Sequence, residues 1–407
     1  MQRSQFDIGL LFATRIARLF AYGFVSVVLV LYLSTAGLAT GQIGLLLTLT
    51  LVGDAVISLW LTTTADRMGR KRTLLIGAAL MLGAGVAFVL TQNPLLLTLA
   101  AIVGVISPSG NEIGPFLSIE QAGLSQLVPD KRRTQIFAWY NLAGSFATAT
   151  GALCAGIIAQ TLQGSGWTPL DSYRAVLAGY ALIGAFMLLA FLGLSPAVEP
   201  PHQTSAQPVR RFLGLYQSRT IVLKLSALFA LDAFAGGFIV QSLVAFWFSV
   251  RFGADVATIG AIFFAANILA GVSALLATRI AARFGLINTM VFTHIPSNVL
   301  LMLVPLMPTL PAAIAVMLVR FSISQMDVPT RQSYTMAVVA PDERSAAAGV
   351  TGIARSLGAA AAPALSGALL AGTLTFSAPF FIAGGLKIVY DLLLFRSFKS
   401  TKPPEEQ

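Results

Sequence analysis

The chain has 407 residues, of which 56% are hydrophobic and 10% are charged, and its formal net charge is +10. Soluble domains average about 25% charged residues, so most of this chain's surface has to face lipid, which excludes an ordinary soluble enzyme. One cysteine and two histidines exclude an internal disulfide and a metal site built from these residues, and no cofactor is expected.

Apolar runs follow one another along the whole chain, separated by short breaks rich in Gly, Pro, Asn or charge. A helix needs about 20 apolar residues to cross a bilayer, so this length holds about twelve spans. The predicted spans are 10–35, 41–63, 73–92, 94–121, 134–161, 173–194, 221–250, 256–279, 286–307, 310–335, 343–371 and 376–397. The sequence therefore predicts an all-α membrane protein with twelve transmembrane helices.

Lysine and arginine are concentrated in alternate connections and at both termini, whereas the other connections hold little more than Arg174 and Arg251. Positively charged loops stay on the cytoplasmic side of a membrane. Both termini and the segment 196–219 are therefore expected in the cytoplasm, with the chain in the inner (plasma) membrane. This distribution also explains the basic charge without a nucleic-acid partner.

The two halves of the chain are similar to each other. The segment 196–219 is the one long polar stretch and predicts a flexible linker between a six-helix bundle at 1–195 and another at 220–407. Matching residues recur at an offset of 212 to 216, such as Phe20, Ala21, Gly23 and Phe24 against Phe234, Ala235, Gly237 and Phe238. Internal repeats of this kind are typical of secondary transporters.

The loop after the second span reads Thr-Thr-Thr-Ala-Asp-Arg-Met-Gly-Arg-Lys-Arg over residues 62–72. It resembles the signature loop of the major facilitator superfamily, G-x-L-A-D-R-x-G-R-K, with Thr62 and Thr64 in place of the first Gly and the Leu. The resemblance implies two pseudo-symmetric six-helix bundles, with spans 1, 4, 7 and 10 around a central cavity. It also implies a monomer that moves a small molecule, similar to drug–proton antiporters.

Four residues of this loop are candidates for a cytoplasmic gate. Gly69 permits a tight turn, and the resemblance makes Asp66 the gate acid, with Arg67 and Arg70 beside it. Asp66 would then lie near the start of span 11, where backbone N–H groups attract an anion. The alternative is that these charges only anchor the loop in the cytoplasm.

Arg18 and Asp232 occupy matching positions in spans 1 and 7. Charged groups inside a span cost about 2.5–3.5 kcal/mol at mid-membrane, so each is a functional candidate. We expect the two to pair when the cytoplasmic side closes, and protonation of Asp232 would weaken that pair. The alternative is that Arg18 reaches the membrane surface beside Arg15.

Span 4 contains the sequence Ser-Pro-Ser-Gly-Asn-Glu-Ile-Gly-Pro at 107–115, which breaks the helix at membrane depth. Freed backbone groups are tolerated there only inside protein or beside a wet cavity. Asn111 and Glu112 are therefore candidates for substrate or proton contact, the alternative being a structural kink. Glu120, at the end of this span, is expected to bond to the basic loops.

Span 10 carries Arg320, Gln325 and Asp327. Arg320 lies near mid-membrane and needs a counter-charge, which Glu112, Asp327 or an anionic substrate would provide. Asp54 in span 2 is a candidate proton site, or equally a structural hydrogen-bonding residue.

Span 12 holds Lys387 and Asp391, which are spaced i, i+4. Residues at this spacing face each other on a helix, so we expect them to neutralise one another locally.

The chain has no Walker loop, so its energy source would be an ion gradient. These features predict a proton-coupled transporter of a small organic solute that operates by alternating access, with export favoured, in contact with protons and membrane lipids. Uptake of an anionic metabolite and lipid transport remain alternatives. A membrane enzyme is disfavoured, because no nucleophile or metal cluster is present.

Overall fold

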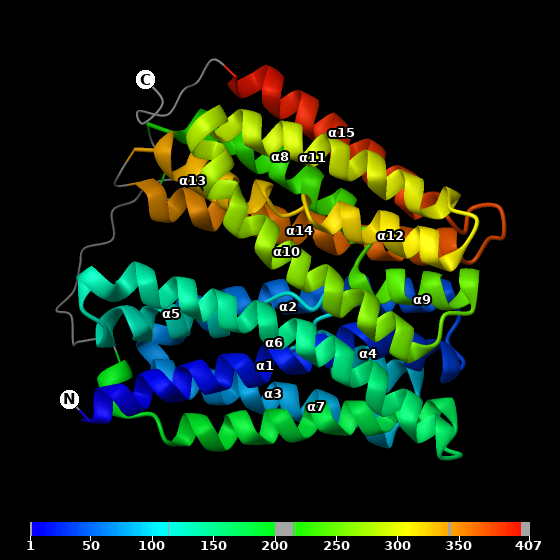
Figure 1. Cartoon of the computed structure of the whole chain (residues 1–407). Coiled ribbons are helices and arrows are strands. Elements are labelled where there is room, and N and C mark those ends of the chain that lie inside the picture. The colour runs from blue at the N-terminus through cyan, green and yellow to red at the C-terminus, as the bar shows by residue number, and fades with distance from the viewer. Residues whose placement is uncertain (1, 113, 200–214, 216, 341–342, 400–407) are drawn as a thin grey trace. The chain divides into compact units, whose positions relative to one another are not determined.

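The computed structural model describes residues 2–112, 114–199, 215, 217–340 and 343–399 (Figure 1). Within these ranges the side chains of residues 2–3, 66, 130–135, 138 and 345 are not described. Every regular element of the described chain is helical. The elements are α1 (Gln2–Thr35), α2 (Thr40–Met68), α3 (Arg70–Leu90), α4 (Pro94–Val103), α5 (Phe116–Leu127), α6 (Asp130–Gly164), α7 (Pro169–Leu192), η1 (Pro196–Val198), α8 (Arg219–Gly237), α9 (Gln241–Phe252), α10 (Val256–Phe284), α11 (Leu286–Leu303), η3 (Val304–Leu306), α12 (Leu310–Phe321), α13 (Asp327–Ala337), α14 (Arg344–Leu370) and α15 (Ala378–Phe398).

Ten helical segments of the described chain are long and apolar enough to cross a membrane. Two shorter apolar helices, α4 and α12, are continued after a break by α5 and α13. The predicted spans 94–121, 221–250 and 310–335 are therefore each built from two helices. The prolines and glycines had predicted the break in 94–121, whereas the other two breaks were not expected.

Contacts divide the chain into two units, which are described separately. Unit 1 comprises Met1–Ser205 and Gln241–Phe264, and unit 2 comprises Ala206–Val240 and Ala265–Gln407. The segment Gln241–Phe264 thus packs with the first half of the chain, although the sequence placed it in the second bundle. Ser242 N donates to Pro108 O at 3.0 Å, and Gln241 Nε2 donates to Ser26 Oγ at 2.8 Å.

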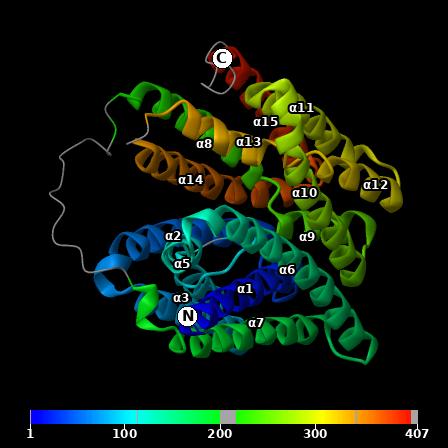
Figure 2. The same ribbon diagram turned by 60° about the vertical axis from the view of Figure 1, so that its left-hand side comes forward.

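In unit 1, α1 packs against α6 and α7 (Figure 2). The contact with α6 is close because glycines face backbone there. A Cβ on Gly23 would lie 2.2 Å from Thr148 O, and a Cβ on Gly151 would lie 2.1 Å from Phe20 O. Only glycine permits this approach, since both distances are far below van der Waals contact.

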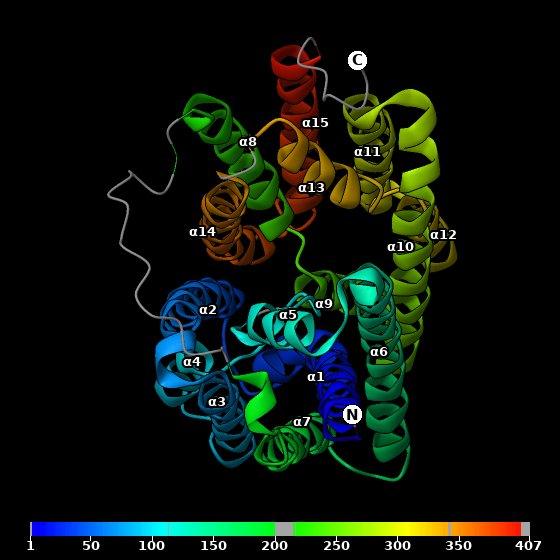
Figure 3. The same cartoon turned by 90° about the vertical axis from the view of Figure 1, so that its left-hand side faces the viewer.

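Unit 2 repeats this arrangement with α8 and α14, which lie side by side (Figure 3). A Cβ on Gly358 would lie 2.3 Å from Ala230 O, and a Cβ on Gly237 would lie 2.5 Å from Ala359 O. The pair α1 and α6 in unit 1 corresponds to the pair α8 and α14 in unit 2. In each unit, glycine allows this pair to make the closest helix contact.

The break in span 4 covers residues 104–115, between α4 and α5. Gly110 and Gly114 have φ values of 70° and 81°, which favour glycine. The freed backbone oxygens find partners: Tyr180 OH donates to Val105 O at 2.5 Å, and Ser107 Oγ donates to Asn111 O at 2.8 Å. A loop buried at membrane depth is tolerated when its backbone groups are satisfied in this way.

Residues 195–199 form a strap that binds unit 1. Asp7 accepts hydrogen bonds from Ser195 N at 3.0 Å and from Ser195 Oγ. Gln126 Nε2 donates to Ala197 O at 3.1 Å and to Glu199 O at 2.7 Å. The predicted flexible linker 196–219 is wrong for residues 196–199, because these contacts hold them. Residues 200–214 and 216 lie outside the described chain.

Candidate functional site

Two arginines on α1 form the centre of a buried charge cluster in unit 1. Arg15 and Arg18 are three residues apart, so both side chains leave the same face of the helix. Arg18 is fully buried and Arg15 is 5% exposed. A buried guanidinium requires acceptors for its N–H groups, and unit 1 supplies them from α5, from α6 and from the break in span 4.

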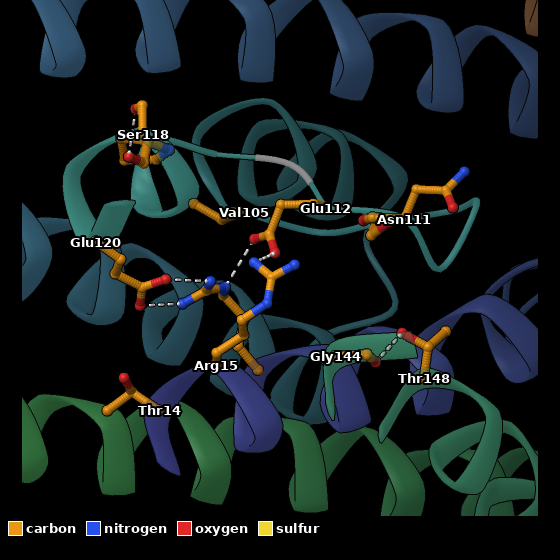
Figure 4. Close-up of polar contacts among 12 residues, drawn as sticks. Thr14, Arg15, Val105, Asn111, Glu112, Ser118, Glu120, Gly144 and Thr148 are labelled. Atoms are coloured by element: carbon orange, nitrogen blue, oxygen red, sulfur yellow. Dashed lines mark hydrogen bonds and ion pairs between the residues drawn. The ribbon is translucent and has the colours of Figure 1, made fainter. Parts of the chain in front are cut away.

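Two glutamates neutralise these arginines (Figure 4). Glu112, in the break, accepts from Arg15 Nη1 at 2.7 Å and from Arg18 Nε at 2.9 Å. Glu120, on α5, accepts from Arg18 Nη1 and Nη2, both at 2.7 Å. The second contact is a bidentate pair, which is the strongest geometry that arginine makes with a carboxylate. Arg15, Arg18, Glu112 and Glu120 are called the arginine–glutamate network below.

Helix α6 supplies further hydrogen-bond partners for this network. Arg15 Nε donates to Tyr140 O at 2.9 Å, and Arg15 Nη2 donates to Asn141 Oδ1 at 3.2 Å. The Tyr140 hydroxyl donates to Glu120. Gly144 leaves room for the guanidinium, since a Cβ there would lie 2.9 Å from Arg15 Nε. The network is therefore charge-balanced, with two cations and two carboxylates.

Glu120 corrects one expectation, since it bonds to Arg18 inside the unit and not to the basic loops. Asn111 and Asp54, the other candidates for substrate or proton contact in this half, do not bond to this network. Asn111 is exposed, and its side chain points away from Arg15 (Figure 4). Asp54 is half-buried on α2, where Ser58 Oγ donates to its Oδ1 at 3.2 Å.

A second charge cluster lies in unit 2 and is centred on Asp232 of α8. Lys387 Nζ of α15 donates to Asp232 Oδ1 at 2.6 Å. Arg331 Nη1 of α13 and Arg355 Nη1 of α14 both approach Asp232 Oδ2 at 3.3 Å. Arg331 Nη1 also donates to Asp327 Oδ2 at 2.8 Å. These five residues are called the Asp232 network.

The expected local pair between Lys387 and Asp391 is wrong. Lys387 turns to Asp232, and Asp391 accepts from His294 Nδ1 at 2.9 Å and from Asn298 Nδ2 at 3.2 Å. Asp391 is fully buried and His294 is 5% exposed. Partners on α8 and α11 thus replace the neighbour one turn away on the same helix.

The predicted pairing of Arg18 with Asp232 stays a prediction. Each residue belongs to a different unit, and each is neutralised by carboxylates or cations of its own unit. Neither therefore needs the other to remain buried.

Arg320 and Gln325 of span 10 differ from Asp327 in their contacts. Arg320 is 8% exposed and its Nε has no hydrogen-bond partner. Asp327, one of its expected counter-charges, binds Arg331 instead. Gln325 contributes its backbone, since its N–H donates to Ser273 Oγ of α10 at 3.4 Å.

The signature loop is held within unit 1. Gly69 has a φ of 98° and joins α2 to α3. Glu199 of the strap accepts from Arg70 N at 2.7 Å and from Lys71 N at 3.2 Å, which satisfies the first N–H groups of α3. Arg70 Nη1 donates to Gln126 Oε1 at 2.9 Å.

The gate role of this loop stays a prediction. Arg67 is exposed, and the side chain of Asp66 lies outside the described part of the structure. The start of α14, its expected partner, belongs to the other unit.

Sequence reasoning did not select several residues that the structure brings into these networks: Arg15, Glu120, His294, Lys387 and Arg331. Each is an ionisable residue in or beside a predicted span, and that signal alone marks a functional candidate. For Arg15 the membrane surface, for Glu120 a helix end and for Lys387 a local i, i+4 neighbour offered a simpler explanation. Arg355 of α14 likewise belongs to the Asp232 network.

Comparisons with known proteins agree with this fold. The chain is 31% identical over 417 residues to the uncharacterized membrane protein YJR124C of Saccharomyces cerevisiae (strain ATCC 204508 / S288c), covering 95% of this chain and 93% of the yeast protein. A crystal structure of a mutant of the nucleoside transporter NupG matches with a TM-score of 0.76 at 15% identity, covering 96% of this chain and 99% of that one. The D-xylose–proton symporter matches with a TM-score of 0.71 at 13% identity, covering 98% of both chains.

The family model of the Major Facilitator Superfamily matches residues 11–363 and 225–407. These matches together span almost the whole chain, including both charge networks. The chain belongs to the Major Facilitator Superfamily of membrane transporters.

Proposed function

We propose that the protein is a proton-coupled secondary transporter that moves a small organic solute by alternating access. In this proposal it has twelve spans in two pseudo-symmetric six-helix bundles, lies in the inner (plasma) membrane with both termini in the cytoplasm, and works as a monomer. The buried carboxylates of the two charge networks serve the proton pathway.

The observation that carries the proposal is the charge balance of the arginine–glutamate network. The arginine–glutamate network has two cations and two carboxylates, all of them largely removed from solvent. A proton that binds Glu112 leaves one positive charge in excess, and a buried excess charge is costly. The excess favours any conformation or bound solute that compensates it, which is the physical requirement for coupling.

Glu112 is the proposed proton acceptor of unit 1. Its side chain is 14% exposed, whereas Glu120 is fully buried. It also lies in the break of span 4, where the backbone is not constrained by a helix. Asp232 is the proposed candidate in unit 2. The three cations that share its two oxygens favour its ionised form, so it takes up a proton only when one of them is withdrawn.

The test is solute flux in proteoliposomes that contain a pH-sensitive dye, with a panel of candidate solutes and an imposed proton gradient. Wild-type protein is expected to show solute-dependent proton movement. Glu112→Gln and Asp232→Asn are expected to abolish accumulation against a gradient, while exchange of solute without net proton movement persists in at least one of them. Asp171→Asn, which changes a half-exposed carboxylate at the start of α7, is the matched control. Solute flux without any proton movement in the wild type would exclude the proposal.

Export is the proposed direction, because the intact A-D-R-x-G-R-K core resembles the loop of drug–proton antiporters. Uptake of an anionic metabolite is the second candidate, and the unpaired Arg320 favours it. The two are separated by the sign of proton movement when solute is added to one side. Lipid transport would instead tolerate neutralisation of both Glu112 and Asp232.

A further inference from the structure

Arg320 differs from the other buried arginines of the spans. Arg15, Arg18 and Arg331 each lie within 3 Å of a carboxylate oxygen. Among the described residues, no carboxylate lies within 4.0 Å of Arg320. The contact that the structure gives its guanidinium is the ring of the adjacent Phe321, whose centroid is 4.9 Å from the Arg320 Cζ. Arg320 is therefore a buried cation without a counter-charge.

The depth of Arg320 makes this arrangement unusual. Arg320 lies ten residues after Leu310, the first residue of α12, and a helix rises 1.5 Å per residue, so it lies about 15 Å along the span. This distance is about half the thickness of the hydrocarbon core. The long side chain does not reach the membrane surface easily from there, and an unpaired charge at this depth marks a functional position.

Two further polar groups of unit 2 also lack a hydrogen-bond partner among the described residues. Ser324, in the break four residues later, is 4% exposed, and its Oγ is enclosed without a hydrogen bond. Helix α10 packs against this break, as the bond from Gln325 N to Ser273 Oγ shows. Asn267 lies six residues before Ser273 on α10, and its Nδ2 is likewise enclosed and unpartnered.

The position of Asn267 relative to Arg320 follows from the direction of the helices. Because α11 returns the chain between them, α10 and α12 run in the same direction. Asn267 and Arg320 precede the Ser273–Gln325 contact by six and five residues, so they lie at a similar depth in unit 2.

The unsatisfied groups share one chemical character. The Arg320 guanidinium and the Asn267 amide nitrogen only donate hydrogen bonds, and the Ser324 hydroxyl also donates. A donor set with one positive charge is complementary to an oxyanion, and arginine forms its best contacts with carboxylate and phosphate. We infer that Arg320, Ser324 and Asn267 bind the carboxylate or phosphate group of an anionic solute. This inference rests on the proposed transport function, and it adds the chemical class of the cargo.

Ligand binding to the full chain, purified in detergent, tests the inference directly. The probes are benzoate and phenyl phosphate, which carry the two candidate groups on the same ring, with benzamide as the neutral control. At least one anion is expected to raise the Tm of the wild type, and benzamide is not. Arg320→Gln is expected to raise the concentration needed for half of that shift by about tenfold or more. Arg251→Gln, which changes an exposed arginine on α9, is expected to leave the shift unchanged.

The anion that binds more tightly identifies the cargo. Preference for benzoate indicates a solute with a carboxylate, and preference for phenyl phosphate indicates a phosphorylated solute. A Tm shift by neither anion, or an equal shift by benzamide, overturns the inference.

A second measurement needs no ligand. Arg320→Met removes an unpaired charge and is expected to raise the Tm of the ligand-free protein or leave it unchanged, whereas Arg18→Met breaks three ion-pair contacts and is expected to lower it. An equal loss in both variants would reveal a counter-charge for Arg320 and overturn the inference.

Failure of the inference and failure of the proposed function give different results. Proton-linked flux that is indifferent to Arg320→Gln removes the anion site and leaves the transporter. Anion binding that depends on Arg320 without any proton-linked flux removes the proton coupling and leaves the site.

Discussion

The two charge networks use similar residues in different ways. In unit 1, Arg18 meets Glu120 through two parallel bonds of 2.7 Å, so Glu120 is dedicated to one cation. In unit 2, Asp232 is shared by three cations, two of them at 3.3 Å. A dedicated bidentate pair holds one geometry, whereas a shared carboxylate can lose one partner and keep the others. The Arg18–Glu120 pair thus resists rearrangement, whereas the Asp232 network allows it.

The largest expected effect tests the dedicated pair. Glu120→Gln leaves the fully buried Arg18 without its bidentate partner, and breaking one side of a buried pair costs about 3–5 kcal/mol. Asp327→Asn in unit 2 is expected to cost less, because it removes a single bond to Arg331 and not a bidentate pair. The free energy of unfolding, measured by titration with SDS, compares the two. Equal losses would remove the distinction between the networks.

A double-mutant cycle sharpens the same comparison. The coupling between Arg18 and Glu120 is expected to be about 3 kcal/mol, the upper end for contacting residues, and that between Asp232 and Lys387 about 1 kcal/mol. The difference arises because Asp232 retains two arginines when Lys387 is replaced by Gln. The cycles use Arg18→Gln with Glu120→Gln, and Asp232→Asn with Lys387→Gln. A larger coupling between Asp232 and Lys387 than between Arg18 and Glu120 would show that the Asp232 network, and not the Arg18–Glu120 pair, holds its geometry more firmly.

Helix packing is expected to be alike in the two units, in contrast to the charges. Gly151→Ala and Gly358→Ala each introduce a Cβ against a backbone oxygen, so both are expected to destabilise by about 1–3 kcal/mol. Gly349→Ala is the control on α14, because nothing lies within 4 Å of its Cβ position. This control is expected to be neutral or stabilising. A loss in only one unit would show that the helix contacts also differ.

The smallest effects concern the acids that bind backbone N–H groups. Glu199 bonds to Arg70 N and Lys71 N, and Glu343 bonds to Gln217 N and Ser218 N, both at 2.8 Å. Replacement by Gln is expected to cost about 0.5–2 kcal/mol, with Glu343 at the upper end because it is fully buried. Thermal unfolding measures the change.

The control for these acids is Asp255→Asn, an exposed helix cap at which asparagine serves as well as aspartate. A cost at Asp255 as large as that at Glu343 would show that burial does not set the order.

Hydropathy and loop charge predicted the helical membrane fold, and the Pro–Gly pattern at 107–115 predicted the break that carries Glu112. The choice of partners was not predictable in the same way. Lys387 and Asp391 are neighbours on one helix surface, yet each turns to a different helix. Local spacing states which residues can meet, but tertiary packing decides which do.

The placement of α9 was also beyond the sequence. Two hydrogen bonds at its start, from the backbone N–H of Ser242 and the amide of Gln241, join it to the rest of unit 1, and neither residue type signals a partner. The close contact of Gly156 with Gly260, where a Cβ on either would lie 3.1 Å from the other's Cα, likewise depends on two residues without side chains. Periodicity detects apolar faces and charges, and it does not detect where backbones meet.

The strap at 195–199 has a practical consequence for dividing the chain into two co-expressed fragments. Because Glu199 covers the first amides of α3 and Ser195 holds Asp7 near the start of α1, an N-terminal fragment that stops at Leu194 loses both attachments. A fragment that extends past Pro200 keeps them. The useful position for a split, a protease site or an inserted reporter therefore begins after residue 200, several residues later than the end of the last apolar run suggests.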